Sequence, residues 1–312
     1  MCLGEGRGCE ISGIIQAHDQ MAEKEIKSSH STLLTCRENL LLLSKPRVMG
    51  ILNTTPDSFS DGGKFDELEA ALRRIDEMVK QGATLIDVGG ESTRPGSDPV
   101  PEEEEVRRTI PVLREAVPRH KEVIFSIDTT KFEVARQALE AGAHMINDVS
   151  GLRKEPRFAD LCADTGAAYV CMHSIADPKT MQDSPEYNDV IDEIYAFFED
   201  RLERLEKAGV ESVVLDPGIG FGKTLDHNLT ILANLEEFLS FRRPLLMGAS
   251  RKSMISQILG GRDSGDRLTG TISVHYHSMM LGARILRVHD VREAVDSVEV
   301  FHAIKKHVPL TD

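Results

Sequence analysis

Polar side chains that can bind or ionise stand directly after eight short apolar runs of the chain. They are carboxylates, amides and bases: Asn53, Asp87, Asp128, Asn147, His173, Asp216, then Ser250 with Arg251 and Lys252, and Arg287 with His289. Carboxylates and amides placed side by side can hold a flat polar ring, because they offer paired hydrogen-bond acceptors and donors. Arginine and lysine beside them suit phosphate oxygens. If the fold brings these residues together, the sequence indicates an acidic and amide-lined pocket next to phosphate-binding bases.

The apolar runs that precede these residues are short and unbroken: 48–52, 84–86, 123–127, 144–146, 169–172, 213–215, 244–247 and 284–286. Such runs are typical of parallel strands that are covered on both faces. Helical patterns lie between them, at 66–81, 101–117, 131–141, 186–208, 226–241 and 267–282. This alternation predicts an α/β protein of the (β/α)8 TIM-barrel class, in which reacting groups gather at the carboxyl ends of the strands. A doubly wound open sheet is the alternative, and it would use only some of those strand ends.

Two segments precede the first predicted barrel strand. Residues 1–32 are glycine-rich and then polar, and we expect a frayed, flexible tail there. Residues 33–44 are apolar on either side of a polar turn at 37–39, which predicts a hairpin that plugs the barrel floor. Because no repeat or linker divides the rest, residues 33–312 are predicted to form a single barrel domain.

The composition narrows the class of protein. Hydrophobic residues make up 40% of the chain, charged residues 28%, and the net charge is −14, which argues against a nucleic-acid partner. No apolar stretch approaches the roughly 18 residues that a membrane span needs, so we expect a soluble protein. Five cysteines without metal-binding spacing or a signal peptide indicate reduced thiols in a cytoplasm.

Two turn-rich loops follow the first two predicted strands. Residues 53–63, Asn-Thr-Thr-Pro-Asp-Ser-Phe-Ser-Asp-Gly-Gly, predict a mobile lid that hinges at its glycines. Residues 87–96, Asp-Val-Gly-Gly-Glu-Ser-Thr-Arg-Pro-Gly, carry Arg94, whose planar guanidinium suits phosphate. For either loop alone an ordinary surface turn is an equally good interpretation, but the two together favour a functional role.

Residues 218–224, Gly-Ile-Gly-Phe-Gly-Lys-Thr, superficially match a phosphate-binding loop. Pro217 stands where a Walker loop needs glycine, and the dinucleotide motif needs its third glycine one residue after Gly222. We therefore interpret the segment as a tight loop that holds Asp216, with Lys223 lining the pocket.

Two acidic features are interpreted as helix starts without a functional role. The run of four glutamates at 102–105 follows Pro101 and favours a helix dipole, so it is predicted to be a solvated terminus. Asp290 with Glu293 three residues later matches a capping box.

Seven strings, in order and with compatible spacing, resemble the dihydropteroate synthase family: 53–63, 87–96, 126–131, 146–151, 215–223, 248–253 and 287–290. The likeness runs from about Leu33 to His307. It implies a barrel fold and a cytoplasmic transferase of folate biosynthesis that sulfonamides target. Its reaction joins 6-hydroxymethyl-7,8-dihydropterin pyrophosphate to p-aminobenzoate, and its products are 7,8-dihydropteroate and pyrophosphate. It also implies a homodimer.

The resemblance implies roles for the residues of the pterin pocket. Asp216 would accept hydrogen bonds from the amino and ring N–H edge of the pterin, a task that requires two acceptor oxygens. Asp128 and Asn147 would bind another polar edge, and Lys252 would donate to the ring carbonyl and neighbouring nitrogen. A polar ring left unpaired in a buried slot would bind badly, so all four contacts are expected to matter.

The remaining implied roles concern the pyrophosphate, the arylamine and catalysis. The pyrophosphate site comprises Asn53, Thr93, Arg94, Arg287 and His289. Asn53 is also implied to bind Mg2+, which prefers oxygen ligands and keeps several waters. The p-aminobenzoate site comprises Phe59, Thr93, Pro95 and Ser250. The catalytic set comprises Arg94, Asp128, Lys252, Arg287 and His289, while the role of Asp87 is left open.

Three other functions fit part of the pattern. A pterin-binding methyltransferase would keep Asp128, Asn147 and Asp216 but has no use for a pyrophosphate site. A Schiff-base aldolase would use Lys252 as an amine nucleophile. A catalytically silent protein would bind pterin without turnover. The segment 174–177, Ser-Ile-Ala-Asp, also departs from the Met-Gln-Gly type stretch often found there in the family, so no contact is assigned to it.

Overall fold

The computed structural model describes residues 32–55, 64–92, 96–175 and 185–307. Except for Thr32, the predicted N-terminal tail lies outside these residues. The same holds for most of the predicted lid, at 56–63, and for part of the unusual segment at 174–177.

Eight strands of the described chain form one parallel sheet in the order β8-β7-β6-β5-β4-β3-β10-β9. Their bounds are β3 Arg47–Asn53, β4 Leu85–Gly89, β5 Ile124–Asp128, β6 Met145–Asp148, β7 Ala168–Met172, β8 Val213–Asp216, β9 Leu246–Met247 and β10 Ile285–Val288. A parallel bridge between Leu215 and Leu245 joins the two ends of this sheet, and the Leu215 N–H donates to the Pro244 carbonyl at 2.9 Å. The TIM-barrel prediction is therefore confirmed, and the open-sheet alternative is wrong.

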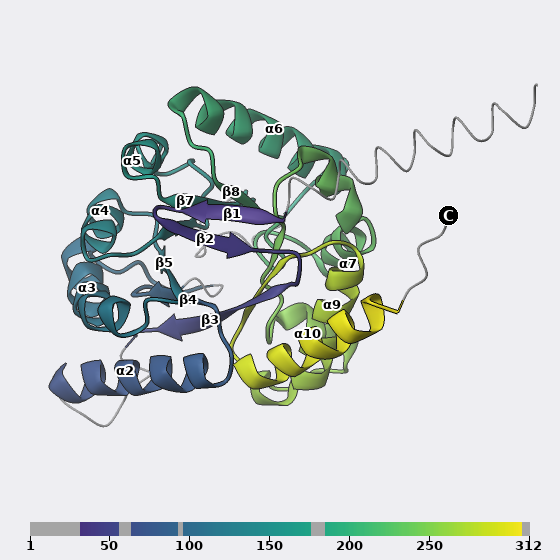
Figure 1. Ribbon diagram of the computed structural model, residues 1–312. Helices are drawn as coiled ribbons and strands as arrows, with labels where there is room; N and C mark the ends of the chain where they lie inside the picture. The colour runs from purple at the N-terminus through teal and green to yellow at the C-terminus, as the bar shows by residue number, and fades with distance from the viewer. Residues whose placement is uncertain (1–31, 56–63, 93–95, 176–184, 308–312) are drawn as a thin grey trace, which may run out of the picture.

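Helices surround the strands (Figure 1). They are α2 Lys64–Lys80, α3 Glu102–Arg119, α4 Phe132–Glu140, α5 Phe158–Thr165, α6 Val190–Ala208, α7 Leu225–Ala233, α8 Ser253–Ile258, α9 Leu268–Met280 and α10 Val291–Lys305, with 3-10 turns η2 Leu235–Phe241 and η3 Ser264–Asp266. The helix predicted over 226–241 is broken at Asn234, where α7 ends and η2 begins. None of the described helices is long and apolar enough to cross a membrane.

The central strands are buried along their whole length, as their unbroken apolar sequence predicts. Every residue of β4, β5 and β7 is buried. Helices pack outside them and bury apolar side chains such as Ile75 of α2 and Phe198 of α6, and some begin with a local cap. In α6 the Asp189 carboxylate accepts hydrogen bonds from the N–H groups of Ile191 and Asp192, which satisfies two donors that no helical carbonyl can reach.

The N-terminal hairpin closes one end of the barrel. Strands β1 (Leu33–Cys36) and β2 (Asn39–Leu42) pair antiparallel and lie across the barrel opening in Figure 1. Its inner side chains pack against residues at the amino ends of the barrel strands in one apolar cluster that contains Leu34, Cys36, Leu41, Leu43, Met49, Leu85, Ile124, Met145, Val214, Leu246 and Ile285. The predicted floor plug is therefore present, at the end opposite to the strand carboxyl ends.

Candidate active site

Residues from four strands meet in a buried ionic cluster at the carboxyl end of the barrel. Arg287 of β10 donates from Nε to Asp87 Oδ2 of β4 at 2.6 Å, and from Nη2 to Asp128 Oδ2 of β5 at 2.7 Å. Asn147 of β6 donates from Nδ2 to the same Asp87 oxygen at 2.8 Å. The open question about Asp87 is thereby answered for this structure, since its carboxylate orients Arg287 and Asn147.

One guanidinium shared by two carboxylates leaves the cluster short of positive charge. Burial is the main cause that raises the pKa of Asp128 to about 8; Arg287 opposes the shift, while the nearby Asp87 and Glu105 add to it. A cavity of about 20 Å³ lies beside this carboxylate and is also lined by Glu91, Glu105 and Lys131. The cluster can therefore exchange a proton near neutral pH as well as bind polar groups.

Asp216 and Lys252 lie near the ionic cluster, at the end of β8 and after β9. Asp216 ends β8, and its Oδ1 accepts a hydrogen bond from the Gly218 N–H at 2.8 Å. Lys252 follows β9, and its ammonium donates to the Ile219 carbonyl and lies 4.1 Å from the centre of the Phe221 ring. Burial raises the pKa of Asp216, opposed by Lys252, and burial lowers the pKa of Lys252 to about 7, opposed by Asp216. The charges of Asp216 and Lys252 also interact with that of Arg287, so these two residues lie near the ionic cluster at the same end of the barrel.

A strained turn between β9 and α8 presents Ser250 and Lys252. Arg251, which lies between them, has φ of +58°, a conformation that residues with a Cβ rarely adopt. Its N–H donates to Thr271 Oγ1 at 3.0 Å, and its guanidinium Nε donates to Asp290 Oδ2 at 2.9 Å. The predicted capping box at Asp290 is therefore wrong, because its side chain makes no cap hydrogen bond to α10 and binds Arg251 instead.

Ser250 and His289 belong to different predicted subsites, yet they are in contact. Ser250 Oγ lies 3.0 Å from His289 Nδ1 and accepts the His289 N–H at 3.2 Å. His289 is further placed by Arg74 of α2, whose Nη2 donates to its carbonyl at 2.9 Å. The predicted arylamine and pyrophosphate sites are therefore adjacent.

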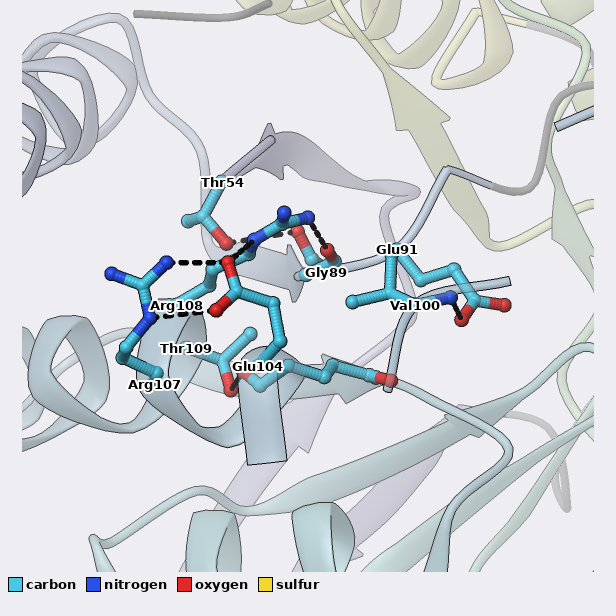
Figure 2. A network of polar contacts seen from close by, with 10 residues as sticks. Thr54, Gly89, Glu91, Val100, Glu104, Arg107, Arg108 and Thr109 are labelled. Atoms are coloured by element: carbon cyan, nitrogen blue, oxygen red, sulfur yellow. Dashed lines mark hydrogen bonds and ion pairs between the residues drawn. The ribbon is translucent and has the colours of Figure 1, made fainter. Parts of the chain in front are cut away.

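The described ends of the loop between β4 and α3 are tied down by polar contacts, which Figure 2 shows from close by. Thr54 Oγ1 donates to the Gly89 carbonyl at 3.1 Å, and Arg108 Nη1 of α3 donates to the Gly90 carbonyl at 2.9 Å. Glu91 Oε2 accepts the Val100 N–H at 2.7 Å, which joins the start of the loop to its end. The loop begins and ends at defined positions beside the ionic cluster.

The prediction that residues 102–105 form a solvated helix terminus is wrong for Glu105. Its side chain is only 1% exposed, and its Oε2 binds the Lys131 ammonium, which also contacts Glu91 Oε2 at 2.6 Å. A buried carboxylate needs such a partner because desolvation disfavours its charge, and burial does raise the pKa of Glu105. The sequence signal for this contact was Lys131, a lone lysine three residues after the strand end at Asp128.

Several predicted site residues lie outside the described chain: Phe59, Thr93, Arg94 and Pro95. Their assignments remain predictions. Asn53 ends β3 opposite Gly89 of β4, so it stands at the same end of the barrel as the ionic cluster. Within the described residues, no group of three or more histidine, cysteine, aspartate or glutamate side chains could hold a metal ion.

Known proteins resemble the chain over most of its length. A family model described as pterin binding enzyme matches residues 49–289. Dihydropteroate synthase of Escherichia coli strain K12 is 49% identical over 263 residues, which cover 84% of this chain and 92% of that protein. A Xanthomonas albilineans dihydropteroate synthase with 4-aminobenzoic acid has a TM-score of 0.83 at 42% identity, covering 89% of this chain and 100% of the other. A Yersinia pestis dihydropteroate synthase with a sulfonamide drug complex has a TM-score of 0.82 at 45% identity, covering 88% and 99%. The chain therefore belongs to the dihydropteroate synthase family of pterin-binding enzymes.

Proposed function

We propose that this chain joins 6-hydroxymethyl-7,8-dihydropterin pyrophosphate to p-aminobenzoate and releases pyrophosphate, as a transferase of folate biosynthesis. The observation that carries the proposal is a set of residues at one end of the barrel: the buried Asp87, Asp128, Asn147 and Asp216 with the partly buried Lys252 and Arg287. Paired acceptors and donors of this kind suit the polar edges of a pterin. Family membership, and a relative in complex with 4-aminobenzoic acid, support the same substrates.

In the proposed complex the pterin lies between Asp216 on one side and Asp128 with Asn147 on the other. Asp216 accepts from its amino and ring N–H edge, while Lys252 donates to its carbonyl. Asn147 and Asp128 bind the other polar edge, and Asp87 holds both Asn147 and Arg287 in place. Because these groups are already hydrogen-bonded to the protein, little rearrangement is required before the ring can bind.

The proposed reaction breaks one C–O bond and forms one C–N bond. The bond from the pterin methylene carbon to the pyrophosphate oxygen breaks, and the electron pair leaves with the pyrophosphate. The arylamine nitrogen attacks the same carbon and loses its proton afterwards, so no strong general base is required. Arg287 and His289 lie two positions apart in sequence at the carboxyl end of the barrel, its mouth, where positive charge favours the departing anion.

We include Mg2+ in the proposal as a charge-neutralising partner of the pyrophosphate. The described residues contribute Asn53, whose amide oxygen suits magnesium, while substrate oxygens and water would complete the shell. When bound, the ion would stabilise negative charge on the leaving group.

Two further proposals concern assembly and compartment. The described cysteines Cys36, Cys162 and Cys171 are free and buried, which supports a reducing cytoplasm. Exposed apolar side chains on the outer helices α8, α9 and α10, namely Ile258, Met280, Val300 and Ile304, support a homodimer. Sedimentation at several protein concentrations tests the dimer.

A coupled pyrophosphate assay tests the reaction. Purified protein with both substrates and Mg2+ should release pyrophosphate and form dihydropteroate. Omission of p-aminobenzoate should abolish dihydropteroate formation, and chelation of Mg2+ should slow it. Pterin binding without pyrophosphate release would contradict the proposal and favour a methyltransferase or a silent binder. Borohydride trapping of a carbonyl substrate on Lys252 would favour the aldolase.

A further inference from the structure

Lys223 is a buried lysine to which the proposed reaction assigns no task. Lys223 lies in the loop between β8 and α7 and is only 3% exposed. The ammonium nitrogen lies 2.9 Å from His173 Nδ1 and donates to the carbonyls of Gly218 and Phe221, each at 3.1 Å. Sequence analysis predicted that Lys223 lines the pocket, but these contacts turn its ammonium toward the backbone of its own loop and the end of β7.

The loop that Lys223 holds supports both sides of the proposed pterin pocket. The Gly218 N–H donates to Asp216 Oδ1, the Ile219 carbonyl accepts from Lys252, and the Phe221 ring lies under the Lys252 ammonium. Three of the five residues from Gly218 to Gly222 therefore contact an assigned pterin-binding side chain.

The loop also packs very closely on the neighbouring strand end. A Cβ on Gly218 would lie 2.0 Å from the His173 carbonyl oxygen, and Gly218 has φ of +69°, so only glycine fits. On Gly220 a Cβ would lie 2.9 Å from Lys252 Cδ. Because glycines permit many backbone conformations, contacts that hold this loop in one shape must offset a large loss of conformational entropy.

The hydrogen bonds of Lys223 provide such contacts, and its ammonium places a positive charge in the loop. A buried ammonium requires several acceptors to offset its desolvation, and here the acceptors come from His173 of the β7 end and from two points of the loop. Burial, together with the Lys223 charge, lowers the pKa of His173 well below its usual range, so its ring is a neutral acceptor. Burial lowers the pKa of Lys223 to about 7, and the charge of Asp216, whose own pKa is raised by burial, opposes that shift.

We propose that Lys223 is a positioning residue for the pterin pocket: by joining the end of β7 to the loop 218–222, it holds Asp216 and Lys252 in their binding geometry. The inference rests on the proposed function, since it deepens the account of the same pocket. It assigns Lys223 no contact with the reacting atoms.

Calorimetric titration with 6-hydroxymethyl-7,8-dihydropterin tests this role without requiring turnover. Lys223→Met should raise the pterin Kd by about tenfold or more, which is the loss expected from one charged hydrogen-bonding group. His173→Leu should raise the Kd in the same direction. His173→Asn should keep the Kd within about threefold of wild type, because the asparagine oxygen can accept in place of Nδ1.

Tyr187→Phe is the matched control, since the Tyr187 hydroxyl donates to the Gly222 carbonyl at 3.0 Å and so ties the same loop at another point. It should lower the melting temperature slightly but leave the pterin Kd within about twofold of wild type. Unchanged pterin affinity in Lys223→Met would overturn the proposal. If Lys223→Met does not fold, equal affinity of His173→Leu and His173→Asn would overturn it. Wild-type protein that binds no pterin would instead refute the proposed function.

Discussion

The two ends of the barrel are built from opposite kinds of side chain on the same strands. At the amino end, the hairpin and the first strand residues form an apolar cluster around Leu34, Leu43 and Met49. At the carboxyl end, the strands carry ionisable residues, namely the buried Asp87 and Asp128 and the partly buried Arg287. Position along a strand, and not burial, therefore decides which residues are available for chemistry.

The two ends must also derive their stability differently. Apolar burial needs only close packing, whereas each buried carboxylate must keep a positively charged or hydrogen-bonding partner. The floor should therefore tolerate charge changes nearby but not cavities, and the mouth should show the reverse. Substitutions at each end test this contrast.

Arg287→Ala should give the largest effect, because it leaves Asp87 and Asp128 as neighbouring buried carboxylates without their shared cation. Breaking such a buried pair costs about 3–5 kcal/mol of unfolding free energy. Turnover should fall more than pterin affinity does. Arg292→Ala, on the exposed surface of α10, is the control and should stay within about 0.5 kcal/mol. Urea unfolding measures both, and a loss below about 1 kcal/mol for Arg287→Ala would show that charge pairing does not hold the mouth together.

Leu43→Ala tests the floor. Leu43 is fully buried in the apolar cluster, so its truncation should cost about 2–5 kcal/mol of unfolding free energy through lost burial and a residual cavity. The pterin Kd of the folded protein should not change. Leu40→Ala removes a leucine of the same hairpin that is 66% exposed, and it should be nearly neutral. A large change in pterin affinity for Leu43→Ala would mean that the two ends are coupled.

Asp216→Ala should weaken pterin binding by about 1.5–3 kcal/mol, because a charged acceptor is removed from buried donors. Stability should change less than in Arg287→Ala. Asp226→Ala, ten residues later on the exposed side of α7, is the matched control. Calorimetric titration with the pterin decides the matter: affinity equal to wild type would remove Asp216 from the pocket.

The barrel and the gathering of polar residues at one of its ends could be predicted because both follow from strand ends. Unbroken apolar runs predicted the eight strands. Because the carboxyl ends of barrel strands lie at one end of the barrel, the polar residues that follow the runs were predicted to meet there. The strand-end positions of Asp128, Asn147 and Asp216 therefore predict that they lie at one end of the barrel, and the structure places them there. The family resemblance added the identity of the ligand, which residue types alone do not supply.

The contacts that sequence reasoning missed are long-range pairings between loops and helices. Glu105 looked like a helix-terminal charge because its neighbours 102–104 do, and only the fold shows that Lys131 reaches it. Asp290 matched a local capping pattern, but its carboxylate instead binds Arg251, which lies 39 positions away in sequence. Local patterns predict local structure, and they do not show which distant charge a side chain will meet.

Lys252 supplies the smallest of the expected effects, a pH dependence of pterin binding. Burial lowers its pKa to about 7, so its ammonium is present below that pH and is lost as pH rises, which should weaken pterin affinity above about pH 7. Asp128, with a pKa near 8, titrates in the same range but gains charge as pH rises, so Asp128→Asn separates the two groups. Lys252→Met should bind pterin more weakly and lose this decline between pH 6 and 9. Persistence of the decline in Lys252→Met would assign it to another group and leave the lysine as a merely structural neighbour of Ile219.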